Sequence, residues 1–172
     1  EPPYIPYRTV LEAVAAGFQP GPSEDERTCL WRSLGSWPAF PDTAPSLARL
    51  KQRYAVIIAS NIDDGLFALS STNLGVECDH IVTAQQVRSY KPGRAHFDEI
   101  LRRTGLASGQ VLHVGESRRH DVEPARALGF RTAWVNRTGD QASASGEPTE
   151  LGVRPDLAVP TLAALCDALG LP

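Results

Sequence analysis

Short apolar runs rich in β-branched residues alternate, from residue 54 to the C-terminus, with segments whose apolar residues recur three and four positions apart. This alternation is typical of a doubly wound parallel sheet in the α/β class. The predicted strands are Tyr54–Ser60, His80–Thr83, Gln110–Gly115, Arg131–Val135 and Asp156–Val159. Because the first and third strands are almost continuously apolar, we expect both of their faces to be buried.

Two amphipathic helices are predicted among these strands. Their apolar stripes are Phe97, Ile100, Leu101 and Thr104, followed by Gly105, and Leu162, Leu165, Cys166 and Leu169, followed by Gly170. A glycine directly after such a stripe commonly ends a helix. We expect both stripes to face the sheet.

The first fifty residues follow another pattern, with two predicted helices and no strand. The helices span Pro6–Gly17 and Ser23–Leu34, and Ser23 with Glu26 three residues later forms a capping box. The proline-rich segment 37–45 (WPAFPDTAP) then predicts a hinge.

The hinge divides the chain into an expected helical unit, residues 1–40, and an expected α/β unit, residues 41–172. Within the second unit, residues 136–155 turn to Gly, Ser, Ala, Glu and Pro without periodicity. That composition predicts a mobile surface loop.

Charge and composition exclude several classes of function. The chain has 17 Lys and Arg against 20 Asp and Glu, a net charge of −3, so it offers no basic field for nucleic acid or an anionic membrane surface. Apolar runs such as Ala55–Ala59 are far shorter than the roughly 20 residues that cross a bilayer. The three cysteines lie far apart and away from any histidine pair, which argues against a disulfide framework and a zinc site and favours a reducing cytoplasm.

The 172 residues contain no methionine and open at Glu1 without a basic and apolar leader. Since a translated chain starts with methionine, we expect the natural beginning of the protein to lie upstream of this sequence.

Polar residues follow the predicted strands. Ser60 and Asn61 follow the first, Thr83 the second, and Glu116 with Ser117 the third. In an open parallel sheet, ligands bind outside the carboxyl ends of the strands, so these groups are expected to converge. Such residues are also common helix N-caps, and for Asn61 or Asp63 alone the two interpretations are equally weighted.

Lys91, one of only two lysines, stands directly before Pro92 and a predicted helix. A compact ammonium there suits the neutralisation of negative charge, whereas an ordinary surface lysine is the simpler alternative. Glu116 and Asp121 can share a Mg²⁺ ion, or can form ion pairs with Arg118, Arg119 or Arg126. The four histidines lack metal-ligand spacing, and His113, within a strand, is interpreted as a core residue.

Three segments carry these residues, in chain order: Ser60-Asn61 after a strand, Lys91-Pro92 before a helix, and Gly115-Glu116-Ser117 with Asp121. Taken in that order, they resemble motifs two, three and four of the haloacid dehalogenase superfamily of hydrolases. The resemblance runs from about Trp37 to the C-terminus, and the stretch AWVNR looks similar to the L-2-haloacid dehalogenase branch. Residues 1–40 would then be a remnant of the helical cap of such enzymes.

In that superfamily an aspartate at the end of the first strand attacks the substrate and forms a covalent ester. This sequence contains no such motif, and by analogy roughly forty N-terminal residues of the family pattern are absent. The missing strand is central in family members, between those predicted here as first and third. We therefore expect a sheet divided into two halves with bare edges, and a chain that is marginally stable or pairs as a homodimer.

The resemblance implies catalytic roles for Ser60, Lys91 and Asp121, of which Lys91 would neutralise the nucleophile and its ester. Asn61 and Arg118 would bind a small anionic substrate, and Glu116 with Asp121 would bind Mg²⁺ if the enzyme is a phosphatase. If it is a dehalogenase, no cofactor is expected.

The substrate class depends on three departures from the dehalogenase pattern. Glu116 and Arg118 stand where those enzymes carry serine and asparagine, and Phe97 replaces a tyrosine. An acid at the position of Glu116 is the phosphatase pattern, so the departures favour a magnesium-dependent phosphatase, with an L-2-haloacid dehalogenase as the alternative. Two non-enzymatic alternatives stay open: a catalytically inactive homologue, and a regulatory module similar to receiver domains, whose acids come earlier in the chain.

Overall fold

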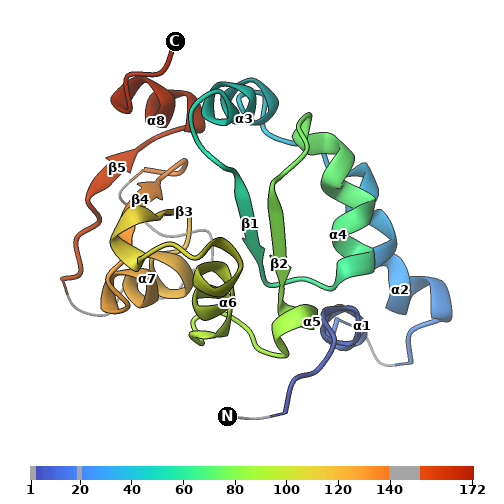
Figure 1. Cartoon of the computed structure of the whole chain (residues 1–172). Coiled ribbons are helices and arrows are strands. Elements are labelled where there is room, and N and C mark those ends of the chain that lie inside the picture. Colours follow the sequence, from blue (N-terminus) through green and yellow to red (C-terminus); the bar gives the residue numbers. More distant parts are fainter. Residues whose placement is uncertain (1–2, 19–20, 140–151) are drawn as a thin grey trace.

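The computed structural model describes residues 3–18, 21–139 and 152–172. Within these ranges five strands form two parallel sheets that lie next to each other (Figure 1). The first sheet contains β1 (Ile57–Ser60) and β2 (His80–Thr83), and the second has the order β3 (Leu112–Gly115), β4 (Arg131–Val135) and β5 (Leu157–Val159). The α/β class, the parallel pairing and the division of the sheet into two halves are thus confirmed.

The register of the pairs brings the predicted site positions to one end of each sheet. Ser60 lies opposite Thr83 in the first sheet, and Gly115 lies opposite Trp134 in the second. Because every pair is parallel, the loops that follow these residues leave the sheets on the same side. The carboxyl ends of β1 and β2 point toward the region of α1 and α5 (Figure 1).

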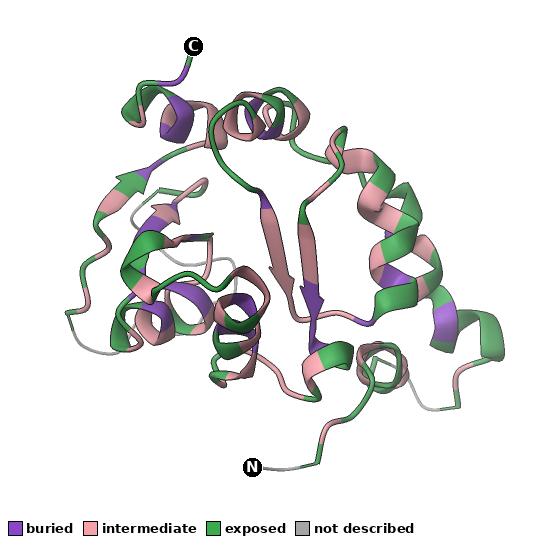
Figure 2. Cartoon of the chain, in the orientation of Figure 1, coloured by how far each residue is buried: buried purple, intermediate pink, exposed green. Residues whose placement is uncertain are grey.

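The expected burial of both faces of the first and third strands is wrong. All four residues of β1 are only partly buried, and Val114 of β3 is 36% exposed. Among the described residues, β1 and β3 each pair with a neighbour along one edge only. An unpaired edge leaves the strand open to solvent, and Figure 2 shows β1 mainly in the colour of intermediate burial.

The described helices have the following bounds. They are α1 (Tyr7–Ala16), α2 (Glu24–Ser33), α3 (Thr43–Lys51), α4 (Asp64–Ser71), α5 (Ala84–Val87), α6 (Ala95–Thr104), α7 (Glu123–Ala127) and α8 (Leu162–Ala168). Short 3₁₀ turns at Leu34–Ser36, Thr72–Leu74 and Ser108–Gln110 and a π-helical turn at Arg118–Val122 complete the set. No helix within the described ranges is long and apolar enough to cross a membrane.

The two amphipathic stripes are packed as predicted. Phe97 and Ile100 of α6 are buried, and Phe97 packs with Ala125 and Phe130 in one core cluster. Leu165 of α8 is buried in a second cluster against β4 and β5. Both helices are followed by a glycine with positive φ, Gly105 and Gly170, as the sequence predicts.

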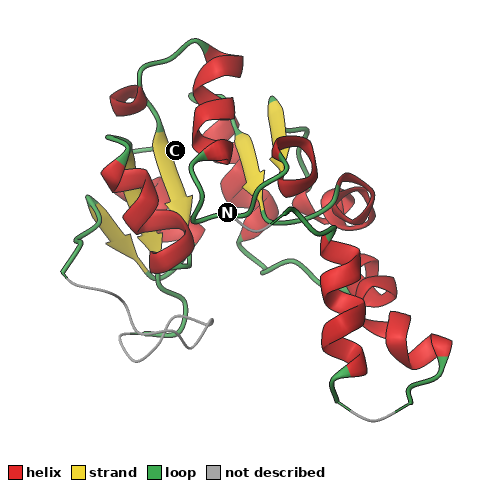
Figure 3. Cartoon of the chain, turned by 90° about the horizontal axis from the view of Figure 1, so that it is seen from below, coloured by secondary structure: helices red, strands yellow, loops and turns green. Residues whose placement is uncertain are grey.

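The N-terminal helices α1 and α2 pack against each other and extend away from the sheets (Figure 3). The capping box of Ser23 and Glu26 is present at the start of α2. The last part of the segment interpreted as a hinge forms the first turn of α3, where Pro45 is tolerated because the first turn of a helix needs no backbone N–H donor. The division of the chain at this segment stays a prediction. The predicted mobile loop falls mostly on residues 140–151, outside the described residues.

Helices α3 and α8 join the two half-sheets at the end away from Lys91. Arg49 of α3 donates hydrogen bonds to Asp167 Oδ1 and to the carbonyl of Leu171, both at 2.7 Å. Asp42, just before α3, accepts a hydrogen bond from the first backbone N–H of α8 at 2.8 Å. These contacts hold the halves together, since no ladder hydrogen bonds join the two sheets in the part of the chain that the structure describes.

Candidate active site

Lys91 is largely shielded from solvent at the carboxyl end of β1. Its Nζ donates hydrogen bonds to Asp121 Oδ1 at 2.5 Å and to the carbonyl of Ala59 at 2.8 Å. The side chain of Lys91 is 10% exposed and that of Asp121 is 12% exposed. The interpretation of Lys91 as an ordinary surface lysine is therefore excluded, and one cation bridges the two half-sheets.

Asp121 reaches Lys91 from the π-helical turn that follows β3. Ser117 caps this turn by accepting a hydrogen bond from the backbone N–H of His120. The approach is close, because a Cβ added to Gly115 would lie 2.4 Å from the Cβ of Asp121. A side chain at position 115 would displace Asp121, so the observed position of the carboxylate requires glycine at the end of β3.

The Asp121 carboxylate is held in its charged form by two donors. Burial acts to raise its pKa, but the hydrogen bond from His113 Nε2 at 3.0 Å and the Lys91 ammonium together lower the pKa of Asp121 to about 2. His113 is buried in β3, as predicted for a core residue, and the tilted ring of Phe97 lies 5.0 Å from its own. An ionised Asp121 keeps the Lys91 ammonium fixed.

Asn61 fixes the backbone of Lys91. Its amide oxygen accepts from Lys91 N at 2.7 Å, and its Nδ2 donates to Lys91 O at 3.0 Å. Ser60, one residue earlier, lies at the end of β1, and its carbonyl is 3.1 Å from His96 Nε2. The structure thus brings Asn61, Lys91 and Asp121 together at the carboxyl end of β1, where Ser60 lies between Ala59 and Asn61 in the chain.

Glu116 and Arg118 lie on the second half-sheet. The carbonyl of Glu116 accepts a hydrogen bond from Trp134 Nε1 at 2.7 Å. The guanidinium of Arg118 lies 5.3 Å from the ring centroid of Trp134 and donates to the carbonyl of Val153 at 2.7 Å. These contacts of Arg118 are with the β4 side of the sheet rather than with Lys91, so its role in binding substrate stays a prediction.

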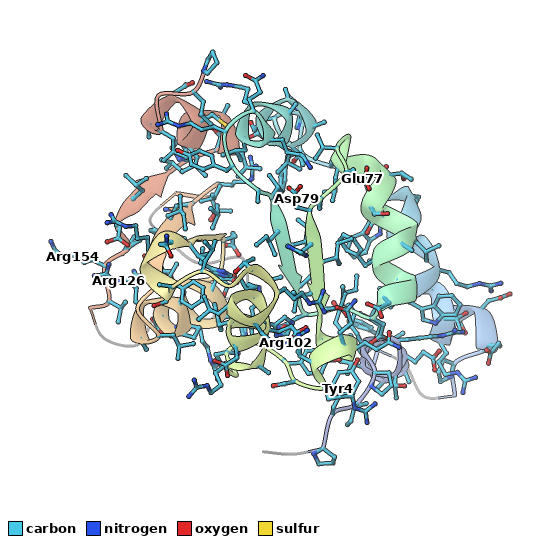
Figure 4. All side chains as sticks on the ribbon, viewed as in Figure 1. Tyr4, Glu77, Asp79, Arg102, Arg126 and Arg154 are labelled. Carbon is cyan, nitrogen blue, oxygen red and sulfur yellow. The ribbon has the colours of Figure 1, made fainter. Side chains whose placement is uncertain are left out.

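The alternative in which Glu116 and Asp121 form ion pairs with neighbouring arginines is partly excluded. Arg126 pairs with Asp156 at 2.5 Å, and Asp121 pairs with Lys91 and His113. Figure 4 shows Arg126 near the outer side of the second half-sheet, away from β1.

A Mg²⁺ ion, which the phosphatase interpretation implies, does not find a complete set of ligands among the described residues. They contain no group of three or more His, Cys, Asp and Glu side chains that could hold a metal. Asp121 is a poor ligand in this arrangement, because its Oδ1 already receives the Lys91 ammonium at 2.5 Å. Glu116 alone is left as a candidate carboxylate, and Mg²⁺ sites use one or two together with water and phosphate oxygens.

Sequence reasoning missed the contacts of Asp63, which follows the site loop. Its Oδ1 accepts from the Tyr4 hydroxyl at 2.6 Å and from Tyr7 N at 2.9 Å, and its Oδ2 accepts from Arg8 N at 2.8 Å. One carboxylate therefore caps α1 and attaches the N-terminal helices to the loop after β1. The ring of Tyr90, beside Lys91, stacks on that of Tyr4 with centroids 5.4 Å apart.

Figure 4 shows Tyr4 near α5, at the carboxyl ends of β1 and β2, whereas Asp79 lies toward their opposite ends. The signal for Asp63 is its position two residues after Asn61, although nothing in the sequence names a partner more than fifty residues away. His96 also went unassigned, because a histidine on an apolar stripe carries no pattern of its own.

The family model for haloacid dehalogenase-like hydrolases matches residues 35–135. Haloacetate dehalogenase H-2 of Moraxella sp. (strain B) is 30% identical over 129 residues, which cover 73% of this chain and 54% of that protein. The chain spans about half the length of the curated relatives it matches.

Solved structures agree with this relationship. An L-2-haloacid dehalogenase from Xanthobacter autotrophicus with chloropropionic acid covalently bound is 22% identical, with a TM-score of 0.82 over 97% of this chain and 77% of that one, and supports the fold. A haloacid dehalogenase-like phosphatase from Thermococcus onnurineus is 27% identical, with a TM-score of 0.67 over 87% of this chain and 66% of that one. On the match over residues 35–135, this chain belongs to the haloacid dehalogenase-like hydrolase family, close to the L-2-haloacid dehalogenases.

Proposed function

We propose that the complete protein is a hydrolase that acts on a small anionic substrate through a covalent aspartyl ester. In this proposal Ser60, Lys91 and Asp121 are catalytic. The observation that supports it most is the largely shielded Lys91 ammonium, held by Asp121 Oδ1 at 2.5 Å and Ala59 O at 2.8 Å at the carboxyl end of β1. A shielded cation so placed suits an anionic reaction centre.

The attacking carboxylate would come from a strand that pairs with both half-sheets. Among the described residues, the second edges of β1 and β3 have no strand partner, and these two strands lie toward each other (Figure 1). A parallel strand between them would end beside Ala59 and Gly115, the neighbours of Lys91 and Asp121. Residues 1–40 are proposed to be part of a helical cap over this end, and Asp63 attaches them.

The proposed chemistry has two steps. A carboxylate oxygen attacks the substrate, the leaving group departs with its bonding electrons, and a covalent intermediate with the enzyme forms. With a phosphate monoester the intermediate is an acyl phosphate and the leaving group is an alkoxide, which takes up a proton from water and leaves as the alcohol. A second water then cleaves the intermediate, inorganic phosphate leaves, and the carboxylate is restored. With a haloacid the intermediate is an ester, halide leaves in the first step, and hydrolysis releases the hydroxy acid and a proton. Lys91 neutralises the carboxylate and the ester, while Ser60 donates a hydrogen bond to the group being transferred.

A phosphate monoester is the proposed substrate class. Glu116 and Arg118 replace the serine and asparagine of the dehalogenase pattern, and Phe97, buried in the core, has no hydroxyl to replace the tyrosine of that pattern. Magnesium dependence is part of this proposal, and Glu116 together with the attacking carboxylate would hold the ion, since Mg²⁺ sites use one or two carboxylates with water and phosphate oxygens. A haloacid is the second candidate, because the relatives include a haloacetate dehalogenase 30% identical to this chain.

The test uses the protein together with any residues that precede Glu1 in its gene. Release of inorganic phosphate from an aryl phosphate only when Mg²⁺ is present would support the phosphatase. Metal-independent release of chloride from 2-chloropropionate would support the dehalogenase. If neither product forms across a broad panel of phosphate esters and haloacids, the hydrolase proposal is wrong.

Lysine variants sharpen the test, since Lys51 and Lys91 are the two lysines of the chain. Lys91→Met is expected to abolish turnover. Lys51→Met is the matched control, because Lys51 pairs with Asp79 at 3.2 Å near the other end of the strands. Equal loss in both variants would contradict the role of Lys91.

A further inference from the structure

Three consecutive residues at the end of β1 form hydrogen bonds with one short segment before and within α6. Lys91 Nζ donates to Ala59 O at 2.8 Å, and the Lys91 backbone exchanges two hydrogen bonds with the Asn61 side chain. Between them, the carbonyl of Ser60 lies 3.1 Å from His96 Nε2. The contacts of Ala59 and Asn61 both involve Lys91, and the contact of Ser60 involves a residue that none of the motifs includes.

The tautomer of His96 follows from its surroundings. The residue is fully buried, and a carbonyl oxygen only accepts, so Nε2 must carry the proton. Burial and the nearby Lys91 ammonium lower the pKa of His96 to about 4, although the hydrogen bond to Ser60 O acts in the opposite direction. The ring is therefore neutral at physiological pH.

The second ring nitrogen shows that packing alone does not account for a histidine here. His96 Nδ1 is buried and has no hydrogen-bond partner among the described residues, which carries a desolvation cost. Its neighbours on the same stripe, Phe97 and Ile100, are apolar and equally buried. An apolar side chain would fill the position without that cost, so the useful property of His96 is its Nε2–H donor.

We infer that His96 is a positioning residue that fixes the carbonyl of Ser60, and through it directs the Ser60 hydroxyl toward the reaction centre. The inference rests on the proposed function for its catalytic consequence. It goes beyond that function because no motif of the resemblance includes His96. The hydrogen bond itself can be tested without turnover.

The experiment compares three variants of the complete protein. His96→Leu removes the donor, and His96→Gln keeps an amide N–H near the position of Nε2. Ile100→Val is the matched control, because it trims a buried side chain of the same helix and leaves the hydrogen bond in place. We expect kcat to fall roughly fivefold to tenfold in His96→Leu with KM within about twofold, and to recover in His96→Gln.

A structural readout on the 172-residue chain separates this inference from the proposed function. The carbonyl ¹³C chemical shift of Ser60 should move in His96→Leu and return toward wild type in His96→Gln, and imidazole ¹⁵N shifts should report an Nε2–H tautomer. An unchanged Ser60 shift in His96→Leu overturns the inference. So does an equal loss of kcat in Ile100→Val, or a failure of His96→Gln to restore it.

If the complete wild-type protein shows no hydrolysis, the proposed function fails and the catalytic consequence fails with it. The Ser60 shift then still decides whether His96 fixes that carbonyl.

Discussion

The side chain of Asn61 forms two hydrogen bonds with the backbone of Lys91, thirty residues later in the chain, at 2.7 and 3.0 Å. The amide thereby closes the loop after β1 onto the turn before α6. Asn61→Ala removes both bonds and leaves two partly buried backbone groups without partners, so we expect a loss of about 1–3 kcal/mol in the free energy of unfolding. Urea denaturation measures it. Asn73→Ala, which removes one exposed hydrogen bond to Trp37 O, should have little effect.

The Lys91–Asp121 pair should behave as a buried ion pair. Removing one partner leaves an uncompensated charge in a poorly hydrated site, so Lys91→Met and Asp121→Asn should each destabilise the chain by roughly 3–5 kcal/mol. The double variant should lose less than the sum. A double-mutant cycle by chemical denaturation tests this, with the exposed pair Arg94 and Asp98 as the control. Equal coupling in the two cycles would contradict the assignment.

Gly115 is predicted to tolerate no side chain. In Gly115→Ala the new Cβ would lie 2.4 Å from the Cβ of Asp121, so Asp121 would have to move away from Lys91. We expect a loss of about 1–3 kcal/mol, as for an overpacked core position. Gly109→Ala is the control, because a Cβ there meets nothing within 4 Å. A Gly115→Ala variant as stable as wild type would show that the turn has room to adjust.

Stability should fall with acid in a window set by His96. The unfolded chain takes up a proton near pH 6.5, whereas the folded protein resists until about pH 4, so protonation favours unfolding between these values. The loss should approach roughly 3 kcal/mol by pH 4. The difference in unfolding free energy between wild type and His96→Leu, measured from pH 8 to 4, isolates this contribution. A constant difference would contradict it.

Asp121 predicts a second, lower window. Its pKa falls from 3.8 to about 2 on folding, so its contribution is complete above pH 3.8 and is lost as the pH falls toward 2. Asp121→Asn removes this dependence and, because the Asp121 charge raises the pKa of His96, also extends the lower end of the His96 window. The same titration of unfolding free energy separates the two, because the windows barely overlap.

Asp63 should hold α1 in place. Both carboxylate oxygens of Asp63 accept hydrogen bonds, Oδ1 from Tyr4 O–H and Tyr7 N–H and Oδ2 from Arg8 N–H. In Asp63→Asn an NH₂ group replaces one of these oxygens, so at least one backbone N–H donor of α1 loses its acceptor. We expect amide hydrogen exchange at Tyr7 and Arg8 to rise by roughly tenfold or more.

Asp64→Asn is the matched control for that experiment. Asp64 accepts hydrogen bonds from Thr83 and Gln86, and within the described residues its side chain makes no hydrogen bond with α1. Faster exchange at Tyr7 in both variants would mean that the loop as a whole, rather than Asp63, determines the result.

Periodicity predicted the strands and the amphipathic helices because each signal is local. His80–Thr83 and Arg131–Val135 carry β-branched apolar runs between clear breaks, and their bounds agree with the structure. Helix α3 was missed because Pro45 lies in its first turn, and proline after a proline-rich stretch indicates a loop. Partial burial of β1 could not be predicted from its composition, since burial depends on which strands flank it.

The site divides in the same way. Lys91 and Asp121 were found because the order of the motifs selects them, although their contact spans thirty residues. His96, His113 and Asp63 complete the network by single hydrogen bonds whose partners are distant in sequence. No local pattern distinguishes such a residue from an ordinary core histidine or helix cap, so their roles required the folded chain.

The open edges of β1 and β3 also bear on how the chain reaches its folded state. Each edge presents backbone groups that accept any extended segment of suitable length. During refolding, extended segments of other copies of the chain can pair with those edges. Native chain is recovered only if the contacts of α3 with α8 and of Lys91 with Asp121 form before such intermolecular pairing. Recovery of native chain from denaturant should consequently decline as its concentration is raised, since only the competing reaction is second order.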